Sequence, residues 1–185
     1  MAELKGIDYF RAFLAMKRDR VLTRYQYYDM KNQVTDFKIS TPPELQWLQA
    51  PMGWCGKAVD SMADRLQFKE FRNDNFKLME IYQMNNPDVL FDSAITSALI
   101  ASCSFIYVSM GEDNYPRLQV IDGANATGDI DPITGFLTEG YAVLERNEYG
   151  APLSEAYFVP GRTDYYYNGE LVESFANSAL YPLLV

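Results

Sequence analysis

The chain has 185 residues, of which 48% are hydrophobic, and this supports one substantial core but excludes two large domains. It contains no histidine, so the Ser-His and Cys-His couples of nucleophilic catalysis and the commonest metal ligand are missing. No apolar run approaches the roughly 18 residues that would cross a membrane, and we expect no secretory signal. The two cysteines, Cys55 and Cys103, lack a zinc-site spacing and favour a reducing cytoplasm as the place of synthesis.

The net charge of −9 is distributed unevenly along the chain. Residues 1–40 hold eight Lys and Arg against five Asp and Glu, residues 41–110 hold five against eight, and residues 111–185 hold three against twelve. The acidic last part would repel the phosphates of nucleic acid. Tight DNA binding by this chain alone is therefore not expected.

Residues 3–31 are predicted to form a helix, because apolar side chains such as Phe10 and Leu14 recur at helical spacing. The polar face of this helix carries four basic side chains that we interpret as solvated surface rather than as a nucleic-acid contact: Lys17, Arg18, Arg20 and Arg24. The next segment, STPPELQWLQAP, is a connector in which prolines break any helix. We divide the chain there into an N-terminal helical segment, residues 1–40, and an α+β domain, residues 41–185.

The stretch MGWCGKAVDSMADRLQFKEF combines a tryptophan, a free cysteine and an arginine, which raises the question of a reactive site. Its apolar side chains instead form one helical stripe, made of Cys55, Ala58, Val59, Met62 and Leu66. Because no histidine can lower its pKa, Cys55 is interpreted as a small buried hydrophobic residue. The alternation in LQFKEF predicts a short strand over residues 66–71.

A second helix is predicted over residues 73–84, and Asn86 followed by Pro87 is typical of a further helix start. The helix from residue 87 to residue 103 is apolar on nearly all sides and is therefore expected to be buried. Four of its residues are assigned to the intramolecular core rather than to a contact between subunits: Ala94, Ala98, Leu99 and Ser102.

From residue 104 the apolar pattern changes to a period of two, which predicts strands. The segments concerned are SFIYVSM, RLQVID, YAVLERN, EAYFVP, TDYYY and ELVES, and GANATGDIDPITG is assigned to turns. Asn168-Gly169 predicts a tight hairpin. The predicted fold class is α+β, with N-terminal helices followed by a mostly antiparallel sheet.

Two clusters could carry chemistry. The carboxylates of Asp122, Asp129 and Asp131 could hold a metal, but no further ligand or lysine is suitably spaced, so turn chemistry is favoured over a metal-dependent enzyme. The run Tyr165-Tyr166-Tyr167 could stack on bases, but a strand with one packed and one solvated face is favoured. No catalytic, cofactor-binding or metal-binding residue is therefore assigned.

Taken together, the segments resemble the N-terminal half of phage portal proteins from long-tailed phages of Gram-positive bacteria and their prophages. The resemblance rests on the Tyr-rich RYQYYDMKN, on GWCGKAVDSMADRLQFKEFRND, on EIYQMNNPDVLFDSAITSALIASCSFIYVSM and on the strand order that begins at PRLQVIDG. In the second segment the matching positions are Trp54, Val59, Arg65, Leu66 and Phe71. Ser102-Cys103-Ser104 departs from the family, in which small residues including glycine precede the strand.

The resemblance implies a structural subunit, not an enzyme, without cofactors. Portal subunits form a dodecameric ring at one capsid vertex, through which DNA is packaged and later ejected. The region seen here would be the wing, and the stem, clip and crown are absent from this sequence. The implied partners are other portal subunits together with capsid and scaffold proteins, whereas terminase and the head–tail connector would bind the absent parts. DNA would only pass through the complete ring, and no membrane is involved.

The implied location is the virion, after synthesis in the cytoplasm of the bacterial host. Two origins of the short chain stay open, a fragment of a portal and a natural short protein that could interfere with ring assembly. A different hypothesis is a portal-like binding module whose acidic sheet docks a capsid or scaffold partner.

Overall fold

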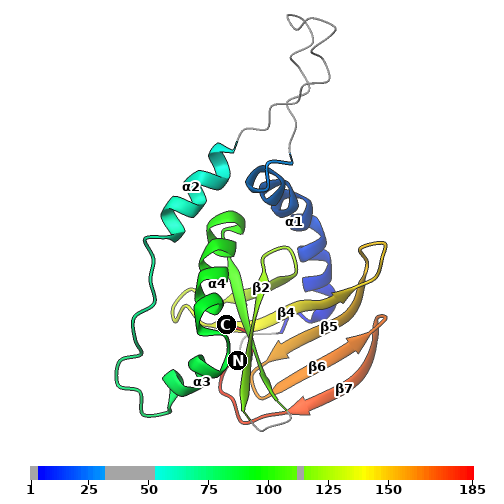
Figure 1. The fold of residues 1–185 in the computed structure, drawn as a ribbon. Coiled ribbons are helices and arrows are strands. Elements are labelled where there is room, and N and C mark those ends of the chain that lie inside the picture. Colours follow the sequence, from blue (N-terminus) through cyan, green and yellow to red (C-terminus); the bar gives the residue numbers. More distant parts are fainter. Residues whose placement is uncertain (1–3, 32–52, 112–114) are drawn as a thin grey trace, which may run out of the picture.

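The structure is a computed structural model that describes residues 4–31, 53–111 and 115–185, and Figure 1 shows its arrangement. The predicted connector at residues 40–51 lies outside the described residues. The described helices are α1 (Ile7–Tyr28), α2 (Trp54–Ala63), α3 (Leu78–Met84) and α4 (Pro87–Ala101). They precede two antiparallel sheets, so the predicted α+β class is confirmed.

The smaller sheet is a hairpin of β1 (Ser104–Met110) and β2 (Pro116–Asp122). The larger sheet contains β3 (Ala126–Ile130), β4 (Leu137–Arg146), β5 (Pro152–Val159), β6 (Arg162–Tyr167) and β7 (Glu170–Ala176), paired in chain order. Asn168 and Gly169 join β6 to β7 with φ values of 51° and 86°, as a tight turn of the primed type requires. The predicted hairpin at these two residues is confirmed.

The larger sheet lies between α1 on one face and the β1–β2 hairpin on the other (Figure 1). On the first face, Phe10 and Leu14 of α1 pack against Tyr141 of β4 and Tyr157 of β5. The second face forms a separate core with the β1–β2 hairpin, and its buried members are Phe105, Tyr107, Ile121, Ala126, Ala142, Ala156, Phe158 and Leu184. The small alanine side chains on β3, β4 and β5 leave room for the larger side chains of the β1–β2 hairpin, so the two sheets can pack closely.

Helix α4 packs against the β1–β2 hairpin and also contacts α1. Its predicted burial is partly confirmed, because Ala94 is buried and Ala98 and Leu99 are half-buried, whereas Ser102 is exposed. Pro87 is the first helical residue, as predicted. Asn86 occupies the cap position but caps with no side-chain hydrogen bond, because it has a left-handed backbone and its carbonyl accepts from Val89 and Leu90 instead.

Two predictions between α2 and α4 are wrong. Residues 66–71 form no strand, because Phe68 and Phe71 turn inward and cluster with Tyr82 and Phe91, with ring centroids of Phe68 and Phe91 4.7 Å apart. The predicted helix over residues 73–84 begins at Leu78. The carboxylate of Asp74 accepts hydrogen bonds from the backbone N–H groups of Leu78 and Met79, and this side chain closes the turn that precedes α3.

The sequence also predicts a turn over residues 126–130, and this prediction is wrong, because these residues form strand β3. Gly128 lies against β4, where a Cβ atom would sit 2.8 Å from the carbonyl oxygen of Glu139, so the glycine allows a close approach of the two strands.

Near the other end of the sequence, Leu184 is buried and pairs with Tyr107 of β1 in an antiparallel bridge. In the described parts of the chain, no helix is both long and apolar enough to span a bilayer.

Candidate functional site

The three aspartates that could have formed a metal site each have a different local role. Asp122 accepts from the N–H of Ala124, and Asp129 forms an ion pair with Lys5 at 2.8 Å. Asp131 accepts from the N–H of Ile133 and from the hydroxyl of Thr134, and these hydrogen bonds lower its pKa. Turn chemistry is thus confirmed for Asp122 and Asp131. Among the described residues, no group of three potential ligands could hold a metal ion.

The tyrosines at the end of β6 are packed on both faces of the sheet, whereas the sequence predicts one packed and one solvated face. Tyr165 is half-buried, and its hydroxyl shares a hydrogen bond with Tyr107 in the core between the sheets. Tyr166 packs on the opposite face, where the guanidinium of Arg11 lies 5.2 Å from its ring centroid. Both faces are therefore partly packed, because the sheet is covered on both sides, and the more solvated Tyr167 is 53% exposed.

Four of the five residues in the predicted stripe are exposed and the fifth, Val59, is half-buried, so the predicted burial of Cys55 is wrong. We define the α2 face as Trp54, Cys55, Ala58, Met62 and Leu66, all of which are exposed, with 80% of Trp54 accessible to solvent. The opposite side of α2 faces the protein through Gly56, where an added Cβ would come within 3.0 Å of the carbonyl oxygen of Tyr28. The hydroxyl of Tyr28 also donates to Asp60. A stripe that was expected to build the core is available to a partner.

A second apolar surface lies at the far edge of the larger sheet. Every residue of β7 is exposed, and three of them are large hydrophobics: Leu171, Val172 and Phe175. β7 pairs with β6 along one edge, and it is the last strand in the order of its sheet. An edge strand presents backbone N–H and C=O groups that can pair with another chain. In Figure 1, β7 and α2 lie at opposite ends of the molecule.

Buried carboxylates hold α1 on the sheet. Glu155 accepts hydrogen bonds from Nε and Nη2 of Arg11 at 3.0 and 2.8 Å, and from the hydroxyl of Tyr141. Glu139 accepts from the backbone N–H groups of Lys5 and Gly6 at 2.8 and 3.2 Å, and also from the hydroxyl of Tyr157. Both carboxylates are almost fully buried, and each has several donors, as a buried charge requires.

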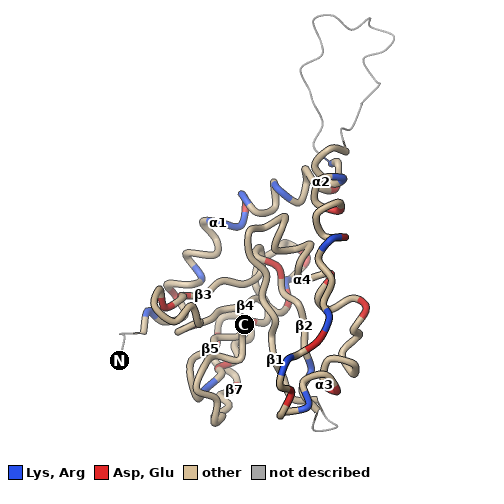
Figure 2. The backbone as a smooth tube through the Cα atoms, turned by 90° about the vertical axis from the view of Figure 1, so that its left-hand side faces the viewer, with Lys and Arg blue, Asp and Glu red and all other residues tan. Residues whose placement is uncertain are grey.

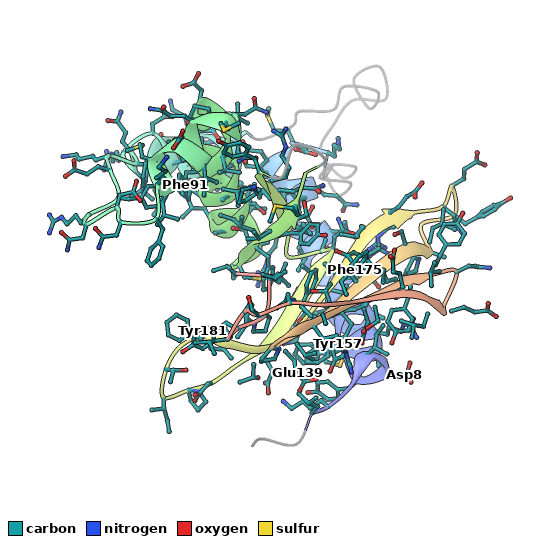
Figure 3. All side chains as sticks on the ribbon, turned by 90° about the horizontal axis from the view of Figure 1, so that it is seen from below. Asp8, Phe91, Glu139, Tyr157, Phe175 and Tyr181 are labelled. Atoms are coloured by element: carbon teal, nitrogen blue, oxygen red, sulfur yellow. The ribbon has the colours of Figure 1, made fainter. Side chains whose placement is uncertain are left out.

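These two groups form a crossed pair between neighbouring strands. Tyr141 of β4 lies directly opposite Tyr157 of β5, and each hydroxyl donates to the glutamate of the other strand. Figure 3 shows Glu139 and Tyr157 close together beside α1. Burial raises the pKa of both tyrosines, and the adjacent carboxylates raise it further. The same Glu-x-Tyr spacing occurs at residues 139–141 and 155–157, and this was the sequence signal that could have revealed the pair.

Comparison with known proteins gives a distant but consistent relationship. No protein-family model matches the chain. The portal protein of Mycobacterium phage L5 is 26% identical over 164 aligned positions, and the match covers 80% of this chain and 34% of the phage protein. The portal protein of Mycobacterium phage D29 is 25% identical over 166 positions, covering 82% of this chain and 34% of that protein. The chain thus spans about a third of the length of these curated relatives.

The comparisons agree with the predicted resemblance to portal proteins of this phage type.

Proposed function

We propose that this chain is a structural part of a phage portal ring and corresponds to the wing region. The similarity to two portal proteins over about four fifths of the chain carries this proposal. The proposed ring has twelve copies when the subunit is complete, stands at a capsid vertex, and serves packaging and ejection of DNA. Contacts with capsid and scaffold proteins belong to the same proposal, and so does a structural rather than an enzymatic role.

The two exposed apolar surfaces support a ring. A closed ring needs heterologous contacts, in which one surface of a subunit meets a different surface of the next. The α2 face and β7 are two such surfaces at opposite ends of the molecule (Figure 1). We therefore assign the α2 face of one copy and the β7 edge of its neighbour to the same interface. Tryptophan is a frequent hot spot in protein interfaces, which makes Trp54 the first residue to test.

Sedimentation of the purified chain over a range of concentrations tests this assignment, with electron microscopy of the largest species. We expect self-association into ring-shaped particles, and at least a tenfold weaker association for Trp54→Ala. Tyr149→Ala is the matched control, because Tyr149 is 93% exposed and lies on the turn between β4 and β5. A chain that stays monomeric at about 100 µM, or equal effects of the two substitutions, would contradict the proposed interface.

The acidic region supports one alternative, a binding module for a basic partner. Residues 111–185 hold twelve Asp and Glu against three Lys and Arg. Capture of a basic capsid or scaffold protein by a monomeric chain, with an affinity that falls steeply as salt is added, would favour this alternative over the ring.

A further inference from the structure

A cleft of about 540 Å³ lies beside α1, between that helix and the turns that end the β4–β5 and β6–β7 hairpins. Its apolar walls include Leu14, Val143 and Pro152. Five charged side chains line the cleft. Arg11 and Arg18 come from α1 and Arg146 comes from β4, and the two acids are Asp19 and Glu155. Three cations against two anions make this cleft positive in a chain whose net charge is −9. Figure 2 shows Lys and Arg repeated along α1.

The five charged groups are not equivalent. Arg11 and Glu155 neutralise each other through two hydrogen bonds, and Tyr141 donates to the same carboxylate. Asp19 is exposed. Its charge is therefore screened by solvent, whereas Arg18 of α1 and Arg146 of β4 are half-buried and dominate the field in the cleft.

Arg18 has an unsatisfied polar atom. Its Nε is buried and has no hydrogen-bond partner among the described residues, and such a group is costly when it belongs to a cation. An anion in the cleft would supply the acceptor. This position therefore differs from Arg20 and Lys17 on the same helix, which are exposed and solvated.

In the described part of the chain, the hydrogen-bond partners of Arg146 are neutral acceptors. Its Nε donates to Oδ1 of Asn125 at 2.8 Å, and its Nη1 donates to the carbonyl oxygen of Gly150 at 3.0 Å. These neutral acceptors fix the guanidinium on the rim of the cleft. Burial lowers the pKa of Arg146, and the positive charge of Arg18 lowers it further, so the two cations act on each other.

We propose that this cleft binds a phosphate monoester, whose phosphate lies between the guanidinium groups of Arg18 and Arg146. Arginine pairs well with phosphate, because its planar fork can donate two parallel hydrogen bonds to one anion. A phosphate monoester has three terminal oxygens and can therefore accept from two guanidinium groups at once. A monoester carries nearly two negative charges at neutral pH and so matches the two arginines, whereas a diester carries one. The apolar walls would take the organic part of the ligand.

Thermal unfolding of the whole chain tests the proposal, with inorganic phosphate, methyl phosphate and dimethyl phosphate as probes at equal ionic strength. A ligand present at about ten times its Kd should raise the Tm by roughly 3–5 °C in a domain of this size. We expect that rise with inorganic phosphate and with methyl phosphate, relative to chloride, and a much smaller one with dimethyl phosphate. An equal rise with dimethyl phosphate would contradict a site for a dianion.

Matched variants separate binding from the general stabilisation that phosphate gives to proteins. Arg18→Gln should abolish the rise, and Arg20→Gln, a change of the same kind on the exposed side of α1, should keep it. Arg146→Lys retains the positive charge but removes the planar guanidinium, so it should reduce the phosphate-induced rise in Tm. A phosphorus NMR titration provides a second measurement, in which the phosphate signal should broaden with the unaltered protein and not with Arg18→Gln. An unchanged response of Arg18→Gln in both measurements would overturn the site, and the portal role would be unaffected.

Discussion

At the scale of single residues, the described structure is organised by polar groups inside it as much as by its apolar core. The Glu-x-Tyr pairs on β4 and β5 place two carboxylates and two hydroxyls under α1. A hydrophobic pattern predicts which residues of a strand face inward, but it treats an inward glutamate as an exception. The sequence pattern misses Glu139 and Glu155 for this reason, because their donors include groups on α1 and on the two residues before it, more than a hundred residues away along the chain.

The buried tyrosines should make stability fall at alkaline pH. A tyrosine in the unfolded chain ionises near pH 10, whereas Tyr141 and Tyr157 keep their protons to higher pH because burial and the neighbouring carboxylates raise their pKa. Their contribution is complete below about pH 10 and is lost as the pH rises toward the folded pKa, since the unfolded state then binds fewer protons. Each tyrosine should remove up to about 1.4 kcal/mol of unfolding free energy per pH unit.

Urea unfolding between about pH 8 and about pH 11 measures this slope. The double variant Tyr141→Phe/Tyr157→Phe should be less stable at neutral pH but should show a shallower decline. Tyr149→Phe is the control, because that side chain is 93% exposed and should leave the slope unchanged. Equal slopes for the double variant and the unaltered chain would show that these hydroxyls do not govern the alkaline transition.

At the scale of elements, the pattern predicts a helix better than it predicts which side of the helix is buried. The stripe from Cys55 to Leu66 correctly indicated α2, yet the protein side of this helix is the one that carries Gly56. This short helix contacts both α1 and α4, and two of its attachments, the close backbone approach at Gly56 and the hydrogen bond from Tyr28 to Asp60, leave no apolar signature in the sequence. The strand prediction for the segment after α2 is wrong for a different reason. The alternation in LQFKEF places Phe68 and Phe71 in an aromatic cluster and not in a strand.

The start of α1 should depend on one side chain of the sheet. Glu139 accepts hydrogen bonds from the backbone N–H groups of Lys5 and Gly6, directly before α1, so Glu139→Ala would leave those donors and the hydroxyl of Tyr157 without their acceptor. We expect a loss of about 3 kcal/mol in the free energy of unfolding and faster amide exchange in the first turn of α1. Glu145→Ala, at an exposed position of the same strand, should change stability by less than about 0.5 kcal/mol. Similar losses for the two variants would mean that α1 is held by its apolar face alone.

At the scale of the whole molecule, the sequence was sufficient for the fold class and for most of the strands. The period of two, together with Asn168-Gly169, fixed the last hairpin because turn chemistry there is local. Strand β3 was missed because its sequence, ATGDI, contains turn formers and becomes a strand through pairing with β4. The cleft could not be predicted either, since Arg18 and Arg146 line one cleft only when α1 lies across the sheet.

The net charge of −9 sets how copies of this chain should respond to salt. Two equally charged copies repel each other, and the repulsion is screened as the Debye length falls from about 10 Å at 0.1 M salt to about 3 Å at 1 M. An interface built from apolar surfaces such as the α2 face should therefore tighten with sodium chloride, by roughly three- to tenfold over this range. Sedimentation equilibrium at several salt concentrations measures the change.

Two variants locate the repulsion. Glu170 and Glu173 are exposed on β7, so replacing both with glutamine should tighten association at low salt and flatten its salt dependence if β7 lies in the interface. Trp54→Ala should weaken association at every salt concentration, because it removes apolar contact and leaves the charge unchanged. Association that weakens as salt is added would indicate an interface held by ion pairs, and the acidic sheet would then be the surface that meets a basic partner.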